Sequence, residues 1–126
     1  MQRLRSFLPA LVWAAFVLFL GGQSDIRGPR LDLPIPVDKL AHFTIYGVLG
    51  ALAAHGWQRA GRWPGRSGLL VALLLIGAVD EIRQRTVAGR SAEFGDWVAD
   101  ALGLLIAFHL VVWLRGKVRG EGENES

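Results

Sequence analysis

The segment SGLLVALLLIGAVDEIRQ, residues 67–84, decides how the whole chain is interpreted. Its first 13 residues, 67–79, carry no charged side chain. As a helix they would extend over about 20 Å, whereas the hydrocarbon core of a bilayer is about 30 Å thick. A membrane-spanning helix here must therefore continue through the polar stretch that begins at Asp80 and Glu81. Polar side chains at that depth are costly unless they are paired or solvated, which makes them candidates for function.

The sequence contains three further apolar blocks, and each is bounded by charged residues, Gly or Pro. The 126-residue chain is 52% hydrophobic, more than a water-exposed domain of this size can bury. The first block follows Arg3 and Arg5, as in a secretory signal peptide, but no clear small-x-small cleavage site follows it. We therefore predict an all-α fold, an integral membrane bundle of four transmembrane helices. The expected spans are approximately residues 7–22, 38–57, 67–85 and 94–114.

These spans form a single domain over residues 1–114, and the polar, glycine-containing tail 115–126 is predicted to be disordered. The absence of cysteine excludes disulfide frameworks and thiolate metal sites. The formal net charge is +3, but the basic residues are scattered through connecting segments, so we expect no nucleic-acid partner. The expected partner is the lipid bilayer itself.

The distribution of Lys and Arg predicts the orientation of the bundle. The side that holds both termini carries eight: Arg3, Arg5, Arg59, Arg62, Arg66, Arg115, Lys117 and Arg119. The opposite side carries six: Arg27, Arg30, Lys39, Arg83, Arg85 and Arg90. The excess favours both termini in the cytoplasm. Four tryptophans at the ends of spans are interpreted as anchors at the membrane interface: Trp57, Trp63, Trp97 and Trp113.

Polar residues are expected to converge at one end of the bundle. Alternating spans place the start of the second helix, the end of the third and the start of the fourth on one side of the membrane. Within each helix, polar residues four positions apart share a face, as Asp38, His42 and Tyr46 do. The candidate site consists of Asp38, Lys39, His42, Tyr46, Asp80, Glu81, Gln84, Arg90, Asp96 and Asp100.

Each of these residues has an ordinary structural explanation when it is taken alone. Asp38 and Asp96 could cap helix N-termini, for example, and a lysine near a span end could extend to the headgroups. Capping does not explain His42 or Asp100, which lie inside apolar blocks. The joint occurrence of the polar residues therefore favours one shared site.

Several motifs occur in a characteristic order between residues 37 and 114: Asp38-Lys39-x-x-His42-Phe43-x-x-Tyr46, Asp80-Glu81-x-x-Gln84, Gly89-Arg90-Ser91, and Asp96 with Gly103. This order resembles the paired signature of VanZ-like membrane proteins. The chain departs from that pattern at Thr86, where an aromatic residue is usual, and at Ala88, where proline is frequent. Asp100 stands where asparagine is usual, and the added carboxylate changes the charge of the expected site.

The resemblance implies a four-helix, multi-pass protein of the bacterial cytoplasmic (inner) membrane that is associated with the cell envelope. The namesake of the family is associated with resistance to the glycopeptide teicoplanin by lowering its binding to the cell surface. A role in glycopeptide susceptibility is therefore an expectation for this chain.

Three interpretations of the polar site stay open. In the first, a non-catalytic protein binds an anionic lipid or cell-wall precursor through Lys39, Arg85 and Arg90. In the second, a membrane enzyme uses a His/Asp/Glu cluster on a lipid-linked substrate, and magnesium, calcium or manganese would suit its oxygen ligands. No HExxH motif, nucleophile elbow or glycine-rich phosphate loop accompanies this cluster. In the third, a buried ion-pair network fixes only the helix register.

Overall fold

The computed structural model describes residues 1–21, 37–86 and 94–125. Within these ranges, Gly21, Val37 and Asp38 are described by their backbone alone. Every regular element in these ranges is a helix, which confirms the all-α prediction. The elements are α1 (Gln2–Arg5), α2 (Leu8–Gly21), α3 (Val37–Arg59), α4 (Arg66–Gln84) and α5 (Phe94–Asn124). The short helix α1 has no counterpart in the sequence prediction.

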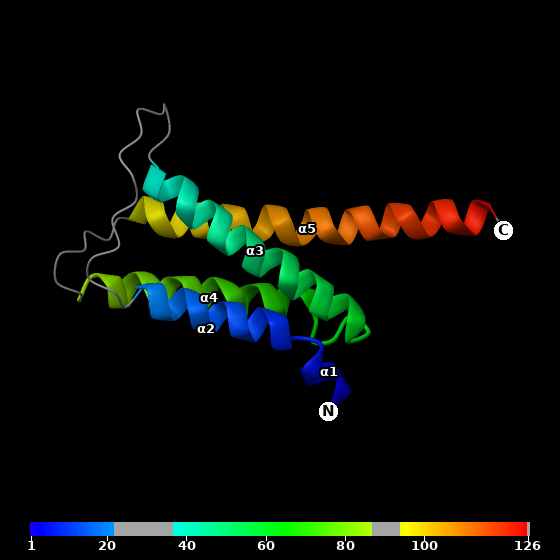
Figure 1. Cartoon of the computed structure of the whole chain (residues 1–126), viewed down its shortest axis with the longest axis horizontal. Coiled ribbons are helices and arrows are strands. Elements are labelled where there is room, and N and C mark those ends of the chain that lie inside the picture. Colours follow the sequence, from blue (N-terminus) through cyan, green and yellow to red (C-terminus); the bar gives the residue numbers. More distant parts are fainter. Residues whose placement is uncertain (22–36, 87–93, 126) are drawn as a thin grey trace.

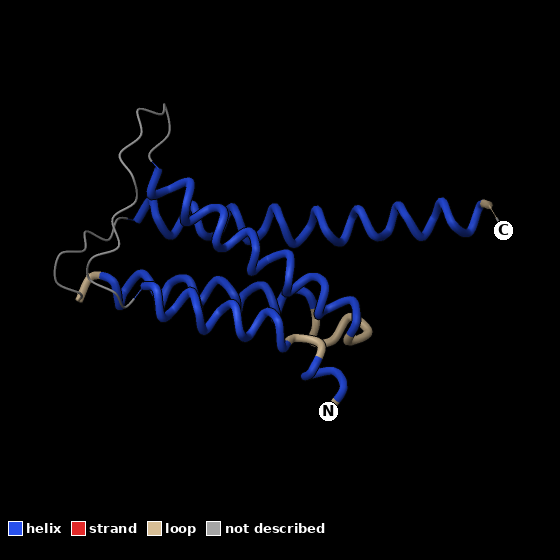
Figure 2. The backbone as a smooth tube through the Cα atoms, viewed as in Figure 1, coloured by secondary structure: helices blue, strands red, loops and turns tan. Residues whose placement is uncertain are grey.

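The four long helices form two layers. In Figure 1, α3 crosses α5 in one layer, and α2 lies beside α4 in the other. The α3–α5 interface is the most extensive, and further contacts join α2 to α3, α4 to α5 and α2 to α4. Figure 2 shows the loop between α3 and α4 at the end of the molecule where α1 lies. The start of α3, the end of α4 and the start of α5 consequently meet at the opposite end.

Two glycines set the close approach of α3 and α5. A Cβ atom at Gly103 would lie 2.1 Å from the carbonyl oxygen of Phe43. At Gly50 it would lie 2.3 Å from the carbonyl oxygen of Leu104. Both distances are too short for any side chain, so the two backbones can pack at this separation only with glycine at these positions.

The core lies between α2, α3, α4 and α5. Its largest buried apolar side chains include Tyr46, Leu49 and Phe108. The indole of Trp13 is packed against this core and donates a hydrogen bond to the carbonyl oxygen of Ile45 at 2.9 Å. This bond links α2 to α3 and gives a polar side chain in the core its partner.

Trp57 differs from the prediction of an interface anchor, because it is buried. Its Nε1 donates to the carbonyl oxygen of Pro64 at 2.8 Å, in the loop that follows α3. The guanidinium groups of Arg62 and Arg66 lie 5.8 and 5.4 Å from the centre of its ring system. The loop therefore folds back over the indole and satisfies its N–H inside the protein.

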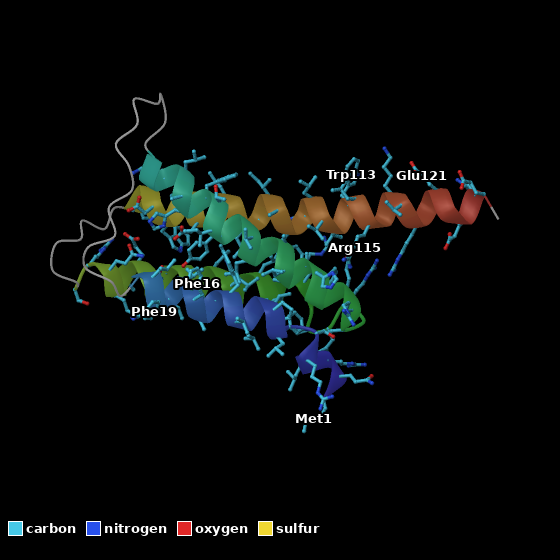
Figure 3. The ribbon with its side chains drawn as sticks, viewed as in Figure 1. Met1, Phe16, Phe19, Trp113, Arg115 and Glu121 are labelled. Atoms are coloured by element: carbon cyan, nitrogen blue, oxygen red, sulfur yellow. The ribbon has the colours of Figure 1, made fainter. Side chains whose placement is uncertain are left out.

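The surface of the bundle is rich in large apolar side chains, whereas several carboxyl groups are buried. On α4, Val71, Leu75 and Val79 are all more than half exposed and follow each other at every fourth position. Phe16 and Phe19 on α2, labelled in Figure 3, are also exposed. Among the residues that the structure describes, the buried polar ones are Asp80, Glu81, Gln84, Asp96 and Asp100. This distribution is the reverse of that in a water-soluble domain.

Among the described residues, one helix is both long and apolar enough to cross a membrane, namely α5. The apolar helix at the N-terminal end, Leu8–Leu20, is shorter. The helix α5 also continues through Asn124, although residues 115–126 were expected to be disordered. Opposite charges four positions apart, such as Lys117 with Glu121 and Arg119 with Glu123, favour this continuation. In Figure 1 it projects beyond the other helices.

Candidate polar site at the junction of α3, α4 and α5

The candidate site begins with an ion pair across the first turns of two helices. Lys39 Nζ on α3 lies 3.4 Å from Asp96 Oδ1 on α5. The Lys39 side chain also covers Gly95, where an added Cβ would lie 3.0 Å from its Cε atom. Asp96 is buried and lies in the first turn of α5, where a carboxylate also interacts favourably with the helix dipole. Lys39 is therefore held by an acid rather than extended freely to the surface.

One turn deeper, a histidine and a carboxylate join the same two helices. His42 Nδ1 lies 2.7 Å from Asp100 Oδ1, and both side chains are largely buried. With Nδ1 engaged by the carboxylate, the orientation of the imidazole ring is set, and Nε2 is the nitrogen left for a further partner. The structure thus brings together the two residues that helix capping could not explain.

A second carboxylate is bound between α3 and α4. The hydroxyl of Tyr46 donates to Asp80 Oδ2 at 3.1 Å, and the amide Nε2 of Gln84 donates to the same oxygen at 3.0 Å. All three side chains are at most 4% exposed. The ring of Tyr46 also packs against Gly77 of α4, where a Cβ would be 3.4 Å from Cε1. Asp80 therefore has two donors on one oxygen.

Several carboxylate oxygens of the cluster have no hydrogen-bond donor among the described residues. Both oxygens of Glu81 are in this state, as are Asp80 Oδ1 and Asp100 Oδ2. Glu81 is buried within electrostatic reach of His42 and Asp96. An unsatisfied buried polar atom costs about 1–3 kcal/mol, and more when it is charged. In native structures such atoms are explained by strain, by a catalytic role, or by a bound water or ion that supplies the missing partner.

The cluster is acidic as a whole. Its described side chains include four carboxyl groups but only two basic groups, Lys39 and His42. No group of three or more His, Asp or Glu side chains within the described ranges is arranged to hold a metal ion. The described geometry therefore offers hydrogen-bond acceptors rather than a preformed metal centre.

Trp97 contributes to the site in a way that the sequence did not indicate. Its Nε1 donates to the carbonyl oxygen of Leu74 at 3.4 Å, and its ring lies beside Gly77. The indole thereby packs α5 against α4 next to the acidic residues. The only signal for this contact in the sequence is a large residue on one helix, Trp97, combined with a glycine on another, Gly77.

The remaining predicted residues lie at or beyond the ends of the described ranges. The backbone of Asp38 is in the first turn of α3, but its side chain lies outside the described residues, as does the whole of Arg90. Arg85 follows α4 directly and is exposed. The participation of Asp38 and Arg90 in the polar site stays a prediction.

These features define a class, namely an all-helical protein with a carboxylate-rich cluster between three helices and an apolar exterior. A family model described as VanZ/LLP1 matches residues 3–115. The chain therefore belongs to the VanZ/LLP1 family, in agreement with the resemblance seen in its motifs. No curated protein and no solved structure matches the chain.

Proposed function

We propose that this VanZ/LLP1 protein is a four-helix, multi-pass protein of the bacterial cytoplasmic membrane with both termini in the cytoplasm. The support comes from the reversed distribution of side chains, with an apolar exterior on the long helices and carboxyl groups between them. In lipid such an exterior is favourable, and buried polar residues that face neighbouring helices mark functional positions. In this arrangement the acidic cluster lies near the outer face.

The protein binds, in this proposal, the polar headgroup of an envelope lipid or a lipid-linked cell-wall precursor at the cluster. The observation that carries the proposal is the set of buried carboxylate oxygens without donors, above all both oxygens of Glu81. A headgroup with hydroxyl or ammonium groups supplies such donors. The phosphate of the same headgroup suits the basic residues at the rim, Lys39 and Arg85, with Arg90 as a third candidate.

The position of the cluster agrees with recognition from the membrane side. Lys39 and Asp96 lie in the first turns of their helices, and Asp100 lies one turn deeper. A lipid-anchored ligand can present its headgroup at this depth while its chains stay in the bilayer. Occupancy of the site would then change which precursors are accessible at the cell surface, and a lower susceptibility to teicoplanin-type glycopeptides would follow.

Native mass spectrometry of the protein released from membrane extracts tests this proposal. We expect a co-purified lipid or precursor on the wild type and its loss in Glu81→Gln. The matched control is Glu121→Gln, the same substitution at an exposed position on the projecting part of α5. Equal retention of the ligand by both folded variants would refute binding at the cluster.

The phenotype has a separate test. A susceptible bacterium that produces the wild-type protein should need more teicoplanin to stop its growth than one that produces Glu81→Gln at equal abundance. Equal susceptibility of the two strains would remove glycopeptides from the proposal but leave the lipid-binding measurement unaffected.

A second candidate function is acid–base chemistry on a lipid-linked substrate. The contact between His42 Nδ1 and Asp100 Oδ1 favours it, because a carboxylate that orients an imidazole is a common arrangement for a general base. Purified protein would be incubated with a bacterial lipid extract and the products analysed by mass spectrometry. A product made by the wild type and by Glu121→Gln, but not by His42→Gln, would establish this function, and identical product patterns would exclude it.

A further inference from the structure

A second polar feature lies at the other end of the bundle, away from the acidic cluster. A cavity of about 650 Å³ opens between α1, the start of α2 and the end of α3. Its lining includes three arginines, Arg3 and Arg5 from α1 and Arg59 from α3, together with the polar side chains Gln2, Ser6 and His55. The described lining contains no Asp or Glu. Three guanidinium groups thus share one hollow without an acid to balance them.

The walls of this cavity are held by close backbone packing. A Cβ at Gly56 would lie 2.6 Å from the carbonyl oxygen of Ser6, so the α1–α2 connection rests directly on α3. The hydroxyl of Ser6 donates to the carbonyl oxygen of Gln2 at 3.1 Å, which ties α1 to the same connection. Arg3 and Arg5 are therefore presented to Arg59 by the fold rather than by a free chain end.

The other cationic side chains of this region are engaged elsewhere. Arg62 and Arg66 lie over the ring of Trp57. Arg115 on α5 donates to His55 Nδ1 at the margin of the cavity, and Figure 3 shows Arg115 beside the end of α3. Because that nitrogen accepts a hydrogen bond, His55 carries its proton on Nε2 and is a donor there. Arg3, Arg5 and Arg59 form no ion pair with any residue that the structure describes.

The depth of the cavity fits the phosphate level of a membrane. Lys39 in the acidic cluster and Arg59 in the cavity are 20 residues apart on the same helix, or about 30 Å. That separation is close to the thickness of a hydrocarbon core of about 30 Å. With the acidic cluster at one interface, the arginine cavity lies at the other.

We propose that this cavity binds a phosphate-bearing group through the guanidinium groups of Arg3, Arg5 and Arg59. Guanidinium is the side-chain group best matched to phosphate, because its N–H groups form paired, charge-assisted hydrogen bonds with phosphate oxygens. Bound phosphate would also relieve the repulsion among the three cations. The group can come from an anionic phospholipid headgroup or from free phosphate. The proposal does not depend on the ligand of the acidic cluster.

The test measures binding of phosphatidylglycerol to the full-length, detergent-purified protein by native mass spectrometry, with phosphatidylcholine as the comparison lipid. We expect a preference for phosphatidylglycerol that weakens by about tenfold in the double variant Arg5→Gln/Arg59→Gln, since two charge-assisted contacts are lost. The control is Lys117→Gln/Arg119→Gln, which removes the same charge from exposed positions on α5. Equal losses in the two double variants would overturn the proposal, because general attraction to cations would then explain binding.

Inorganic phosphate provides a measurement on the unaltered protein. Displacement of phosphatidylglycerol by inorganic phosphate would show that the phosphate group alone is recognised and that free phosphate is a source. Preference for phosphatidylglycerol without displacement would assign the site to the lipid headgroup. If the wild type neither prefers phosphatidylglycerol nor binds inorganic phosphate, the proposal is wrong. Arg59→Lys retains the charge but not the paired donors, and it should bind with intermediate strength.

Discussion

His42 Nδ1 on α3 lies 2.7 Å from Asp100 Oδ1 on α5, and this contact joins the two helices that form the most extensive interface of the protein. Asp100 is 2% exposed, and its second oxygen has no donor among the described residues. The pair therefore combines a structural link between α3 and α5 with unused hydrogen-bonding capacity. Removing one partner leaves the other buried without compensation.

A double-mutant cycle should show that His42 and Asp100 stabilise the bundle together. We expect His42→Ala and Asp100→Ala each to lower the free energy of unfolding by about 2–3 kcal/mol, with a coupling energy of about 1–2 kcal/mol. The measurement is denaturant unfolding in detergent micelles. His109→Ala is the matched control, because the His109 side chain is exposed and its contacts, with the carbonyl oxygen of Leu105 and the ring of Phe108, lie within its own helix. Fully additive effects of the two substitutions would show that the 2.7 Å contact has no energetic role.

Tyr46→Phe should destabilise the protein although it leaves the shape of the core unchanged. The substitution removes one of the two donors to Asp80 Oδ2, and we expect a loss of about 1–2 kcal/mol. In an Asp80→Asn background the same substitution should cost less, because the oxygen that loses its donor is then uncharged. Unfolding midpoints of the four proteins test this, and an equal cost of Tyr46→Phe in both backgrounds would contradict the proposed role of the hydroxyl.

Gly103→Ala should force α3 and α5 apart. The added Cβ would lie 2.1 Å from a backbone carbonyl oxygen, which cannot move without the helix. We expect a loss of stability of about 2–3 kcal/mol. Gly116→Ala on the same helix is the control, since its Cβ would meet no atom within 4 Å and alanine favours helix by up to about 1 kcal/mol. Similar midpoints for the two variants in thermal unfolding would show that the close approach is not needed.

Glu81→Gln should stabilise the ligand-free protein while weakening ligand binding. Neither oxygen of Glu81 has a donor among the described residues, so its burial as a carboxylate is unfavourable. We expect the neutral amide to raise the free energy of unfolding by about 1 kcal/mol. Glu121→Gln should leave it unchanged, because that side chain is exposed. A lower stability of Glu81→Gln would show that the carboxylate is already compensated within the protein.

The approximate positions of the four long helices could be predicted because each apolar block ends at charged, Gly or Pro residues. The two donors to Asp80 show which side-chain contacts can be predicted from the sequence and which cannot. Gln84 lies one turn from Asp80 on the same helix, so helical spacing predicts their contact. Tyr46 reaches Asp80 from 34 residues earlier, and helical spacing within one element carries no information about that contact.

Trp57 and the end of α5 show where local interpretation failed. A tryptophan near a span end resembles an interface anchor, but the loop after α3 supplies a carbonyl acceptor to Trp57, and guanidinium groups of that loop and of the start of α4 lie over its ring. The polar tail resembles a disordered segment, yet α5 continues through it to Asn124. For Trp57, neighbouring groups compensate for an indole N–H that looks unfavourable inside the protein.

The sequence by itself determined that the chain is helical and that it has the motifs of the VanZ/LLP1 family. It also placed His42 and the acids near the start of α3, the end of α4 and the start of α5. Only the tertiary structure decided which of these side chains pair, that Glu81 has no donor among the described residues, and that arginines of α1 and α3 share a cavity. The physical reason is that helix formation depends on local hydrogen bonds and hydropathy. The rotation and separation of neighbouring helices depend instead on contacts between distant residues, such as the approach of Gly103 to Phe43.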